Sequence, residues 1–189
     1  MCGTVKIAVV VGNPKPLSRT LRVAESVADV IEKLLPGEPA ERQIIDLADY
    51  SSRLFEWPEP TLAELNDAVA ASDVLVVASP TYKATYTGLL KAFLDRYPSN
   101  GLGGVVAVPV MTGAAADHAM ATEVNLRPLL VELGATVPGR GLYLVMPRIA
   151  ELDQITAEWG EANAASLVPA ITGRLATRPT TGKTQKAGA

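Results

Sequence analysis

The chain has 189 residues, of which 48% are hydrophobic and 20% charged, so it has enough apolar material for one domain with a substantial core and is not typical of a disordered protein. The net charge of −3 is uneven, because residues 173–189 carry four basic side chains and no acid, and the rest of the chain is acidic enough to argue against a nucleic-acid partner. The single cysteine, Cys2, and the single histidine, His118, exclude a disulfide within the chain and a metal site built from several of either residue.

The sequence shows no feature of a membrane or exported protein. No stretch combines the length and apolar character of a membrane-spanning helix, and the N-terminus lacks the charged and apolar regions of a secretory signal. The basic residues near the C-terminus are too few and too dispersed to favour an anionic surface over water. We therefore expect a soluble cytoplasmic protein with no membrane partner.

The first half of the chain alternates apolar runs with helical patterns. Residues 5–11 are mainly β-branched, which is typical of a strand buried on both faces in a parallel sheet. From Leu21 to Leu35 apolar residues recur at helical spacing, and Pro36-Gly37 ends that helix. The pattern then predicts a second strand, an irregular segment and a short helix at residues 43–47, 48–60 and 62–71.

The second half repeats the alternation. Apolar runs predict strands at residues 73–79 and 104–111 and, less regularly, within 135–145. Helical spacing predicts helices at 88–97, at 114–133 with a kink or break at Pro128, and at 154–171.

A strand followed by a helix, repeated five times, predicts an α/β fold with a doubly wound, five-stranded parallel sheet. We see no internal repeat or linker, so we expect one domain over residues 1–172 and a disordered tail at 173–189. In such sheets ligands bind beyond the carboxyl ends of the strands, where the strand order reverses. The loops after the first, third and fourth strands are therefore the candidate binding loops.

The first of these loops, residues 12–20, leaves a buried strand and enters a helix. Free N–H groups and the positive end of the helix dipole meet there, and Lys15, Ser18, Arg19 and Thr20 add cations and hydroxyls, which suits a phosphate. The loop has neither the Gly-x-Gly-x-x-Gly fingerprint nor a Walker Gly-Lys-Ser/Thr ending, so it suggests the terminal monophosphate of FMN. From spacing alone, a proline-rich turn with Ser18 as helix N-cap is an equally good interpretation.

The other two loops suit a flat ring. Residues 79–88 bring two tyrosines and several hydroxyls to a strand end, where an aromatic side chain can stack on a ring or form its wall. Residues 111–116 are rich in glycine and alanine, which lets a planar ligand approach the backbone. Both also have a structural interpretation, with Thr87 and Thr112 as helix N-caps and Tyr82 as a packing residue.

The sequence offers no catalytic set of side chains. One histidine does not support a Ser-His-Asp arrangement, and no pair of carboxylates stands at the loop ends. This pattern favours chemistry carried by a bound cofactor, with the protein supplying position and electrostatics.

Together, the three loops resemble those of the NADPH-dependent FMN reductase family. Residues 12–20 are similar to its phosphate loop, 79–91 to its second flavin-contacting segment, and Thr112-Gly113 with the region up to Leu130 to its third. The resemblance covers residues 5–170 in order, and the branch it points to is the flavin reductases of two-component sulfonate monooxygenase systems. It implies a flavodoxin-like three-layer sandwich with strand order 2-1-3-4-5.

The resemblance also implies a site. Ser18, Arg19 and Thr20 would hold the FMN phosphate, Pro80 to Lys83 would line the ribityl chain and isoalloxazine, and Thr112 and Gly113 would contact the polar edge of the ring. No residue is assigned a catalytic role, because hydride would pass from NADPH, or NADH, to the flavin. Lys15, Arg19 or Arg22 would pair with the 2′-phosphate of NADPH. The cofactor-binding residues are then Asn13, Lys15, Ser18, Arg19, Thr20, Pro80, Thr81, Tyr82, Lys83, Thr112 and Gly113.

Several functions stay open. The leading one is an NAD(P)H-dependent FMN reductase that supplies reduced flavin to a partner monooxygenase. The alternatives are a reductase with tightly bound FMN that acts on quinones, azo compounds or metal oxyanions, a flavodoxin-type electron carrier, and a binding module that has lost its flavin. Some sulfonate-branch members carry an inserted tyrosine, associated with FMN as a passing substrate, where this chain has Glu123-Val124-Asn125.

The resemblance also bears on assembly. Family members are dimers or tetramers with flavin sites near the subunit interfaces. We therefore expect a homodimer or homotetramer, in which the segment around Trp57 reaches a neighbouring site.

Overall fold

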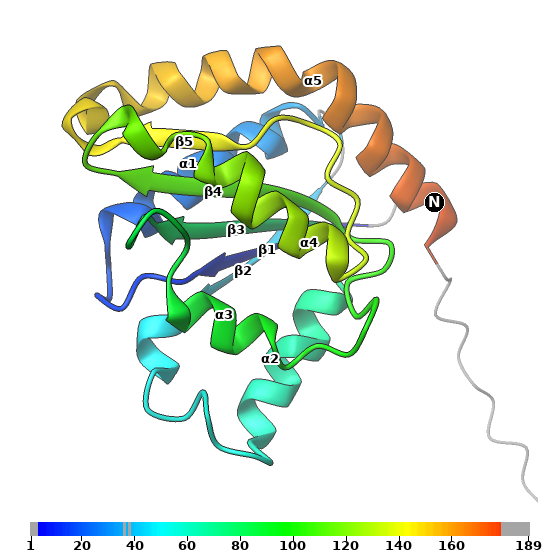
Figure 1. Ribbon diagram of the computed structural model, residues 1–189. Helices are drawn as coiled ribbons and strands as arrows, with labels where there is room; N and C mark the ends of the chain where they lie inside the picture. Colours follow the sequence, from blue (N-terminus) through cyan, green and yellow to red (C-terminus); the bar gives the residue numbers. More distant parts are fainter. Residues whose placement is uncertain (1–3, 36, 38, 179–189) are drawn as a thin grey trace, which may run out of the picture.

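The computed structural model describes residues 4–35, 37 and 39–178, and its centre is a five-stranded sheet in which every pairing is parallel (Figure 1). The strand order is β2-β1-β3-β4-β5, which is the flavodoxin order, so the predicted fold class is confirmed. In register, Val9 of β1 lies opposite Val76 of β3. The strands are β1 (Val5–Val11), β2 (Ala40–Asp46), β3 (Val74–Pro80), β4 (Val106–Gly113) and β5 (Leu142–Val145).

Helices cover both faces of the sheet. One apolar cluster joins the sheet to α1 (Arg19–Lys33) and α5 (Leu152–Thr177), and a second joins it to α2 (Pro60–Ala70), α3 (Gly88–Leu94) and α4 (Arg127–Glu132) (Figure 1). Every residue of β3 and β4 is buried, as expected for strands with helices on both sides. Within the described ranges, no helix is both long and apolar enough to cross a lipid bilayer.

Side-chain caps fix the start of the two helices that follow β1 and β3. Ser18 Oγ accepts a hydrogen bond from Leu21 N (3.2 Å) at the start of α1, and Thr87 Oγ1 accepts one from Leu90 N (3.1 Å) at the start of α3. Each cap satisfies an N–H that has no carbonyl one turn earlier. The N-cap roles considered for Ser18 and Thr87 are therefore confirmed.

The region after β4 is not the long helix predicted for residues 114–133. A 3₁₀ turn η2 (Ala116–His118) is followed by a π-helical turn η3 (Thr122–Leu126) and then by α4, while Thr112 belongs to β4 and caps no helix. Pro128 lies in the first turn of α4, directly after the π-helical turn, which runs into α4 without a break because Leu126 and Arg127 both have helical backbone angles.

The π-helical turn lies where the sequence resemblance placed a family-specific insertion. A π-helical turn pairs residues five apart and so accommodates one more residue than an α-helical turn. The chain therefore has a widened turn at Glu123-Val124-Asn125 without the tyrosine that some family members carry there.

Several element boundaries differ from the prediction. β2 begins at Ala40 and β5 is limited to Leu142–Val145, while short 3₁₀ turns η1 (Leu47–Tyr50) and η4 (Met146–Glu151) follow these strands. α5 continues to Thr177, so residues 173–177 are helical and do not belong to a tail. The rest of the predicted tail, apart from Arg178, lies outside the described residues.

Candidate functional site

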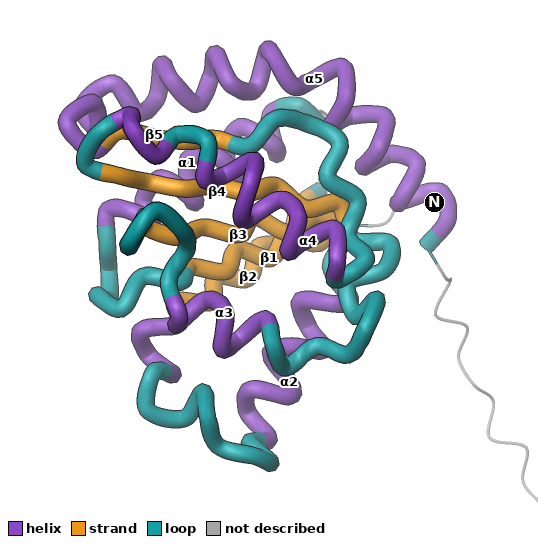
Figure 2. The backbone as a smooth tube through the Cα atoms, viewed as in Figure 1, coloured by secondary structure: helices purple, strands orange, loops and turns teal. Residues whose placement is uncertain are grey.

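The loops that follow β1, β3 and β4 gather at the carboxyl edge of the sheet (Figure 2), where they enclose a pocket of about 610 Å³. This is the position at which doubly wound sheets bind ligands, because the strand order reverses between β1 and β3. The volume falls within the range of about 300–1,000 Å³ that is usual for small-molecule sites. The pocket is lined by Asn13, Lys15, Leu17, Ser18, Arg19, Thr20, Pro80, Thr81, Tyr82, Thr112, Gly113, Ala114 and Met146.

The N-terminus of α1 forms one wall of this carboxyl-edge pocket. The first i→i−4 bond of the helix joins Arg22 N to Ser18 O (3.2 Å), so helix geometry leaves the earlier N–H groups of Arg19 and Thr20 free. Lys15 and Arg19 add two cations, and no acidic side chain is among the described residues that line the pocket. Free N–H groups, the helix dipole and two cations together suit a phosphate.

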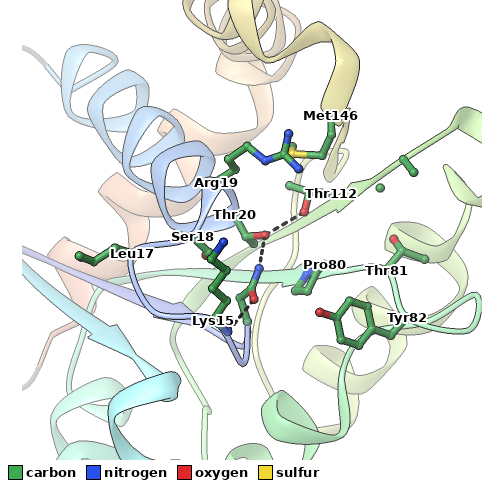
Figure 3. Close-up of a pocket in the computed structure, with 13 residues that line it drawn as sticks. Lys15, Leu17, Ser18, Arg19, Thr20, Pro80, Thr81, Tyr82, Thr112 and Met146 are labelled. Carbon is green, nitrogen blue, oxygen red and sulfur yellow. Dashed lines mark hydrogen bonds between the residues drawn. The ribbon is translucent and has the colours of Figure 1, made fainter.

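A chain of hydrogen bonds ties the first loop to β4. Asn13 Oδ1 accepts from Lys15 N (2.9 Å), and Asn13 Nδ2 donates to Thr20 Oγ1 (3.0 Å). Thr20 Oγ1 in turn lies 2.9 Å from Thr112 Oγ1, and both threonines are buried (Figure 3). The three side chains therefore hold the loop and the strand end in one arrangement.

The first loop is also held from β2 and α3. Leu17 has a positive φ of 50°, and its N–H donates to Asp46 Oδ2 (3.2 Å) at the end of β2. Burial raises the pKa of Asp46 above its ordinary value, against the lowering effect of backbone hydrogen bonds from Ala48 and Leu17. On the other side, Thr87 Oγ1 donates to Gly12 O (2.6 Å), and a Cβ on Gly12 would collide with Leu90.

The second segment forms a wall across from α1. Figure 3 shows Pro80, Thr81 and Tyr82 on the side of the pocket opposite Ser18 and Arg19. Thr81 N donates to Thr112 O (2.7 Å), while the buried Thr81 Oγ1 has no hydrogen-bond partner among the described residues.

A tight turn follows this wall. Tyr82 and Thr85 exchange backbone hydrogen bonds of 2.8 and 3.2 Å across the residues Lys83 and Ala84, both of which have positive φ. Asn125 Nδ2, from the π-helical turn η3, donates to Ala84 O (3.1 Å). The turn is therefore supported from η3, and it directs Tyr82 toward the pocket.

The third segment depends on a glycine. A Cβ on Gly113 would overlap the hydroxyl of Tyr143, which crosses from β5 and donates to Ala115 O (2.9 Å). Glycine therefore allows Tyr143 to support the loop at residues 113–115 from behind.

Comparison with known proteins identifies the chain. The sequence profile of the family described as NADPH-dependent FMN reductase matches residues 5–147. The chain belongs to this family. The resemblance inferred from the three loops, and the assignment to the FMN reductases as an enzyme class, are thereby confirmed.

Individual relatives agree with the assignment to the FMN reductase family. An FMN reductase (NADPH) of Escherichia coli (strain K12) is 29% identical over 73% of this chain and 72% of the relative. An NADH-dependent FMN reductase SfnF of Pseudomonas fluorescens (strain Pf0-1) is 30% identical over 84% of this chain and 85% of the relative. The solved apo form of an NADH:FMN oxidoreductase has 30% identity and a TM-score of 0.71, with 95% of this chain and 92% of that chain covered.

In this FMN reductase family member, ten of the eleven predicted site residues line the carboxyl-edge pocket. Lys83 does not, because it lies in the tight turn after Tyr82 and is exposed to solvent. Leu17, Ala114 and Met146 line the pocket but were not predicted. Leu17 and Ala114 lie within the loops singled out from the sequence, whereas Met146 follows β5, whose carboxyl end opens on the same edge and was not considered.

Proposed function

We propose that the chain is an NAD(P)H-dependent FMN reductase that holds FMN in the carboxyl-edge pocket. The observation that carries this proposal is the N-terminus of α1, where free N–H groups and two cations open into a pocket of about 610 Å³ in a member of the FMN reductase family. When bound, FMN supplies the chemistry, because it accepts hydride from the reduced nicotinamide.

The free groups of the pocket fit FMN. The N–H groups of Arg19 and Thr20, the hydroxyl of Ser18 and the cations of Lys15 and Arg19 would hold the terminal phosphate. The Asn13 side chain already forms hydrogen bonds with Lys15 N and Thr20 Oγ1, so Asn13 would act by keeping the phosphate-binding loop in place.

The opposite wall would hold the ring system. Pro80 and Tyr82 present flat apolar surface, and Thr81, which lies between them and also lines the pocket, would complete this wall. Thr112 and Gly113 would lie at the polar edge of the ring. Lys83, predicted as a direct contact, would act only through the backbone of the turn after Tyr82.

The choice of nucleotide is open to test. One curated relative is named for NADPH and another for NADH, so we expect the chain to use NADPH, NADH or both. Lys15 and Arg19 line the pocket, whereas Arg22 lies one turn further along α1 and is exposed. Lys15, Arg19 and Arg22 are the cations that would pair with the 2′-phosphate, which NADPH carries and NADH lacks.

Steady-state oxidation of NADPH and of NADH by the purified protein, with FMN varied and the bound flavin of the protein recorded, tests the proposal. We expect nucleotide oxidation that depends on flavin. If the protein is colourless and its activity saturates with added FMN, FMN is a substrate. If the protein is yellow and added FMN does not change its activity, FMN is a fixed cofactor. Failure to oxidise either nucleotide with FMN present contradicts the proposal and favours an electron carrier.

We extend the proposal to assembly and location. The exposed side chains of Met120, Val124 and Val131 are apolar and lie on η3, α4 and the turn before them, which supports a homodimer or homotetramer. The resemblance to two-component flavin reductases supports delivery of reduced flavin to a partner monooxygenase in the cytoplasm. Sedimentation equilibrium tests the oligomer, and reduced-flavin transfer to a candidate oxygenase tests the partner.

A further inference from the structure

Backbone strain is concentrated in the loops of the carboxyl-edge pocket. Among the described residues, four that are not glycine have positive φ, and three of them lie in these loops, namely Leu17, Lys83 and Ala84. A positive φ brings the Cβ of an L-amino acid close to a carbonyl oxygen, so it persists only where the surrounding structure holds the backbone. Asp46 holds Leu17 in this way. The contacts that hold Lys83 and Ala84 therefore decide the shape of the second pocket loop.

The turn at Lys83-Ala84 has little support from its own sequence. Tyr82 and Thr85 exchange backbone hydrogen bonds around two central residues with positive φ, which is the pattern of a two-residue hairpin turn of type I′. Such turns favour Asn-Gly, because these two residues tolerate positive φ, and neither lysine nor alanine shares that tolerance. The turn therefore depends on a contact from outside it.

One side chain outside the turn supplies this contact. Asn125 Nδ2 donates to Ala84 O (3.1 Å), and no other hydrogen bond reaches residues 82–86 from elsewhere in the part of the chain that the structure describes. The N–H groups of Thr81 and Thr87 are both bonded, so the segment is fixed only at its two ends. Asn125 is therefore the tether of the turn.

Asn125 is a tether with a fixed position. It lies in the π-helical turn η3, and the neighbouring Glu123 and Arg127 bond to each other and to the segment before β5. Strand β4, which η3 follows, lies between β3 and β5 in the sheet. The turn η3 is thus anchored toward β5, and Asn125 reaches from it toward the loop that follows β3.

The turn matters because it begins at Tyr82. Tyr82 lines the carboxyl-edge pocket, and it is 51% exposed, so few neighbours restrain its ring. The backbone of the turn is then the main restraint on where this ring stands. In the proposed function, Tyr82 forms part of the wall for the flavin ring system.

We propose that Asn125 is a positioning residue for flavin binding, which holds the turn through Ala84 O and thereby keeps Tyr82 in place at the isoalloxazine. This inference rests on the proposed function, since it needs a flavin in the carboxyl-edge pocket. Without the tether the turn populates other conformations, and apparent affinity falls with the fraction that is competent to bind. Because Tyr82 meets the ring, the loss affects FMN and riboflavin alike.

Fluorescence titration of the full chain with FMN and with riboflavin tests this role. Asn125→Ala should weaken the binding of both flavins by about fivefold, the effect of one net hydrogen bond, and leave the ratio of the two dissociation constants unchanged. Asn125→Asp keeps the shape of the side chain, loses the donor and should behave in the same way. In a Tyr82→Ala background, Asn125→Ala should add no further loss, because the tether acts through Tyr82.

A change of turn sequence should rescue the variant. Lys83→Asn/Ala84→Gly supplies the pair that a type I′ turn favours, so in this background Asn125→Ala should cost less than about twofold in flavin affinity. Limited trypsin digestion gives a measurement that needs no flavin. Cleavage after the exposed Lys83 should be about fivefold faster in Asn125→Ala than in the wild type, with an unchanged melting temperature.

The outcomes separate this inference from the proposed function. If the wild type binds both flavins and Asn125→Ala binds them equally well, the inference is overturned and the proposed function stands. An undiminished loss in the Asn-Gly background would overturn it too, because Asn125 would then act on something other than the turn. If the wild type binds neither flavin, the proposed function fails and the inference fails with it.

Discussion

The hydroxyl of Thr20 is engaged within the protein itself. It accepts a hydrogen bond from Asn13 and shares another with Thr112 in which either hydroxyl can be the donor, so the threonine pair keeps one unassigned hydroxyl hydrogen beside the backbone N–H of Thr20. Ser18 Oγ likewise accepts from Leu21 N, although its own hydroxyl hydrogen stays available. Among the pocket residues of α1, Arg19 therefore has the side chain best placed to meet a phosphate, since it forms no ion pair within the described ranges.

Substitution of Arg19 by alanine tests this role. A charge-assisted hydrogen bond contributes about 1.5–3 kcal/mol, so Arg19→Ala should weaken FMN binding about tenfold or more, with little effect on thermal stability. Arg22→Ala is the matched control, because Arg22 is an exposed arginine on the same helix that does not line the pocket. Fluorescence titration with FMN gives both constants, and equal losses in the two variants would mean that general charge attraction accounts for the effect.

Gly113 provides a test of the wall next to β5. Gly113→Ala should lose about 1–3 kcal/mol of unfolding free energy, because its methyl group would overlap the Tyr143 hydroxyl. Tyr143→Phe removes that hydroxyl and should recover part of the loss in the double variant. Urea unfolding of the four proteins measures the coupling, and additive losses would show that the two side chains do not meet.

Lys83 illustrates a limit of prediction at this scale. The resemblance assigned it to the flavin together with Pro80, Thr81 and Tyr82, but Lys83 and Ala84 both adopt positive φ, which places them in a tight turn. Two-residue turns with positive φ usually contain Asn-Gly or a similar pair, whereas this turn contains Lys83-Ala84. The position of Lys83 therefore could not be read from the sequence.

At the scale of elements, the π-helical turn η3 is held by one ion pair, Glu123 with Arg127, that makes three hydrogen bonds to the segment before β5. Glu123 Oε2 accepts from Arg127 Nε (2.5 Å), and Glu123 Oε1 accepts from Gly141 N (2.7 Å). Arg127 Nη1 donates to Val137 O (2.7 Å). The pair thus connects η3 to the segment before β5, and Asn125 connects η3 to the turn after Tyr82.

This arrangement predicts a pH dependence. Burial alone would raise the pKa of Glu123, but hydrogen bonds from Arg127 and Gly141 and nearby positive charge outweigh it and hold the pKa below its ordinary 4.5. The folded state therefore gains stability above pH 4.5 that is lost as the pH falls through the lowered value. Glu123→Gln should have a lower melting temperature than the wild type at neutral pH, and this difference should disappear in acid. Glu132→Gln, at an exposed glutamate, is the control. A difference between Glu123→Gln and the wild type that does not change with pH would contradict the stabilising role of ionised Glu123.

The last turns of α5 are fixed by a buried carboxylate. Asp73 is fully buried before β3, where its Oδ2 accepts from Lys6 N (2.8 Å) and the carboxylate lies 3.7 Å from Arg174 and 3.4 Å from Arg178. The apolar spacing predicts a helix only as far as Ile171, and the sequence beyond it, rich in Gly, Thr and Lys, predicts a tail. The partner of these basic residues is about 100 positions away in the chain, so local pattern did not reveal it.

Asp73→Asn tests this anchor. Removal of the charge leaves two arginines facing a neutral group, so we expect a loss of about 3 kcal/mol of unfolding free energy. Asp95→Asn, which breaks the exposed pair with Lys91, should cost less than about 1 kcal/mol. Urea denaturation at low and moderate salt compares them, and similar small losses in both variants would mean that the Asp73 pairs do not anchor α5.

At the scale of the whole molecule, the inner strands β1, β3 and β4 were predictable because they are buried and read as apolar runs, whereas β2 is a mostly exposed edge strand whose start was missed. The helix predicted at 114–133 failed for a tertiary reason. Glu123 and Arg127 bond to a segment near β5 and Asn125 to a turn after β3, and these distant partners favour a π-helical turn within a shorter helical stretch that begins only at Ala121. The pocket was predictable because its loops are fixed by topology.

The central claim is that the pocket at the carboxyl edge holds FMN through its phosphate at the N-terminus of α1. The most direct measurement compares the dissociation constants of FMN and riboflavin, which share the ring and differ in the phosphate, for the wild type and for Arg19→Ala. The account predicts that the wild type binds FMN about tenfold or more tightly than riboflavin, and that salt and Arg19→Ala both reduce this difference. Equal affinity for FMN and riboflavin would contradict the account, because the N-terminus of α1 would then not bind the phosphate.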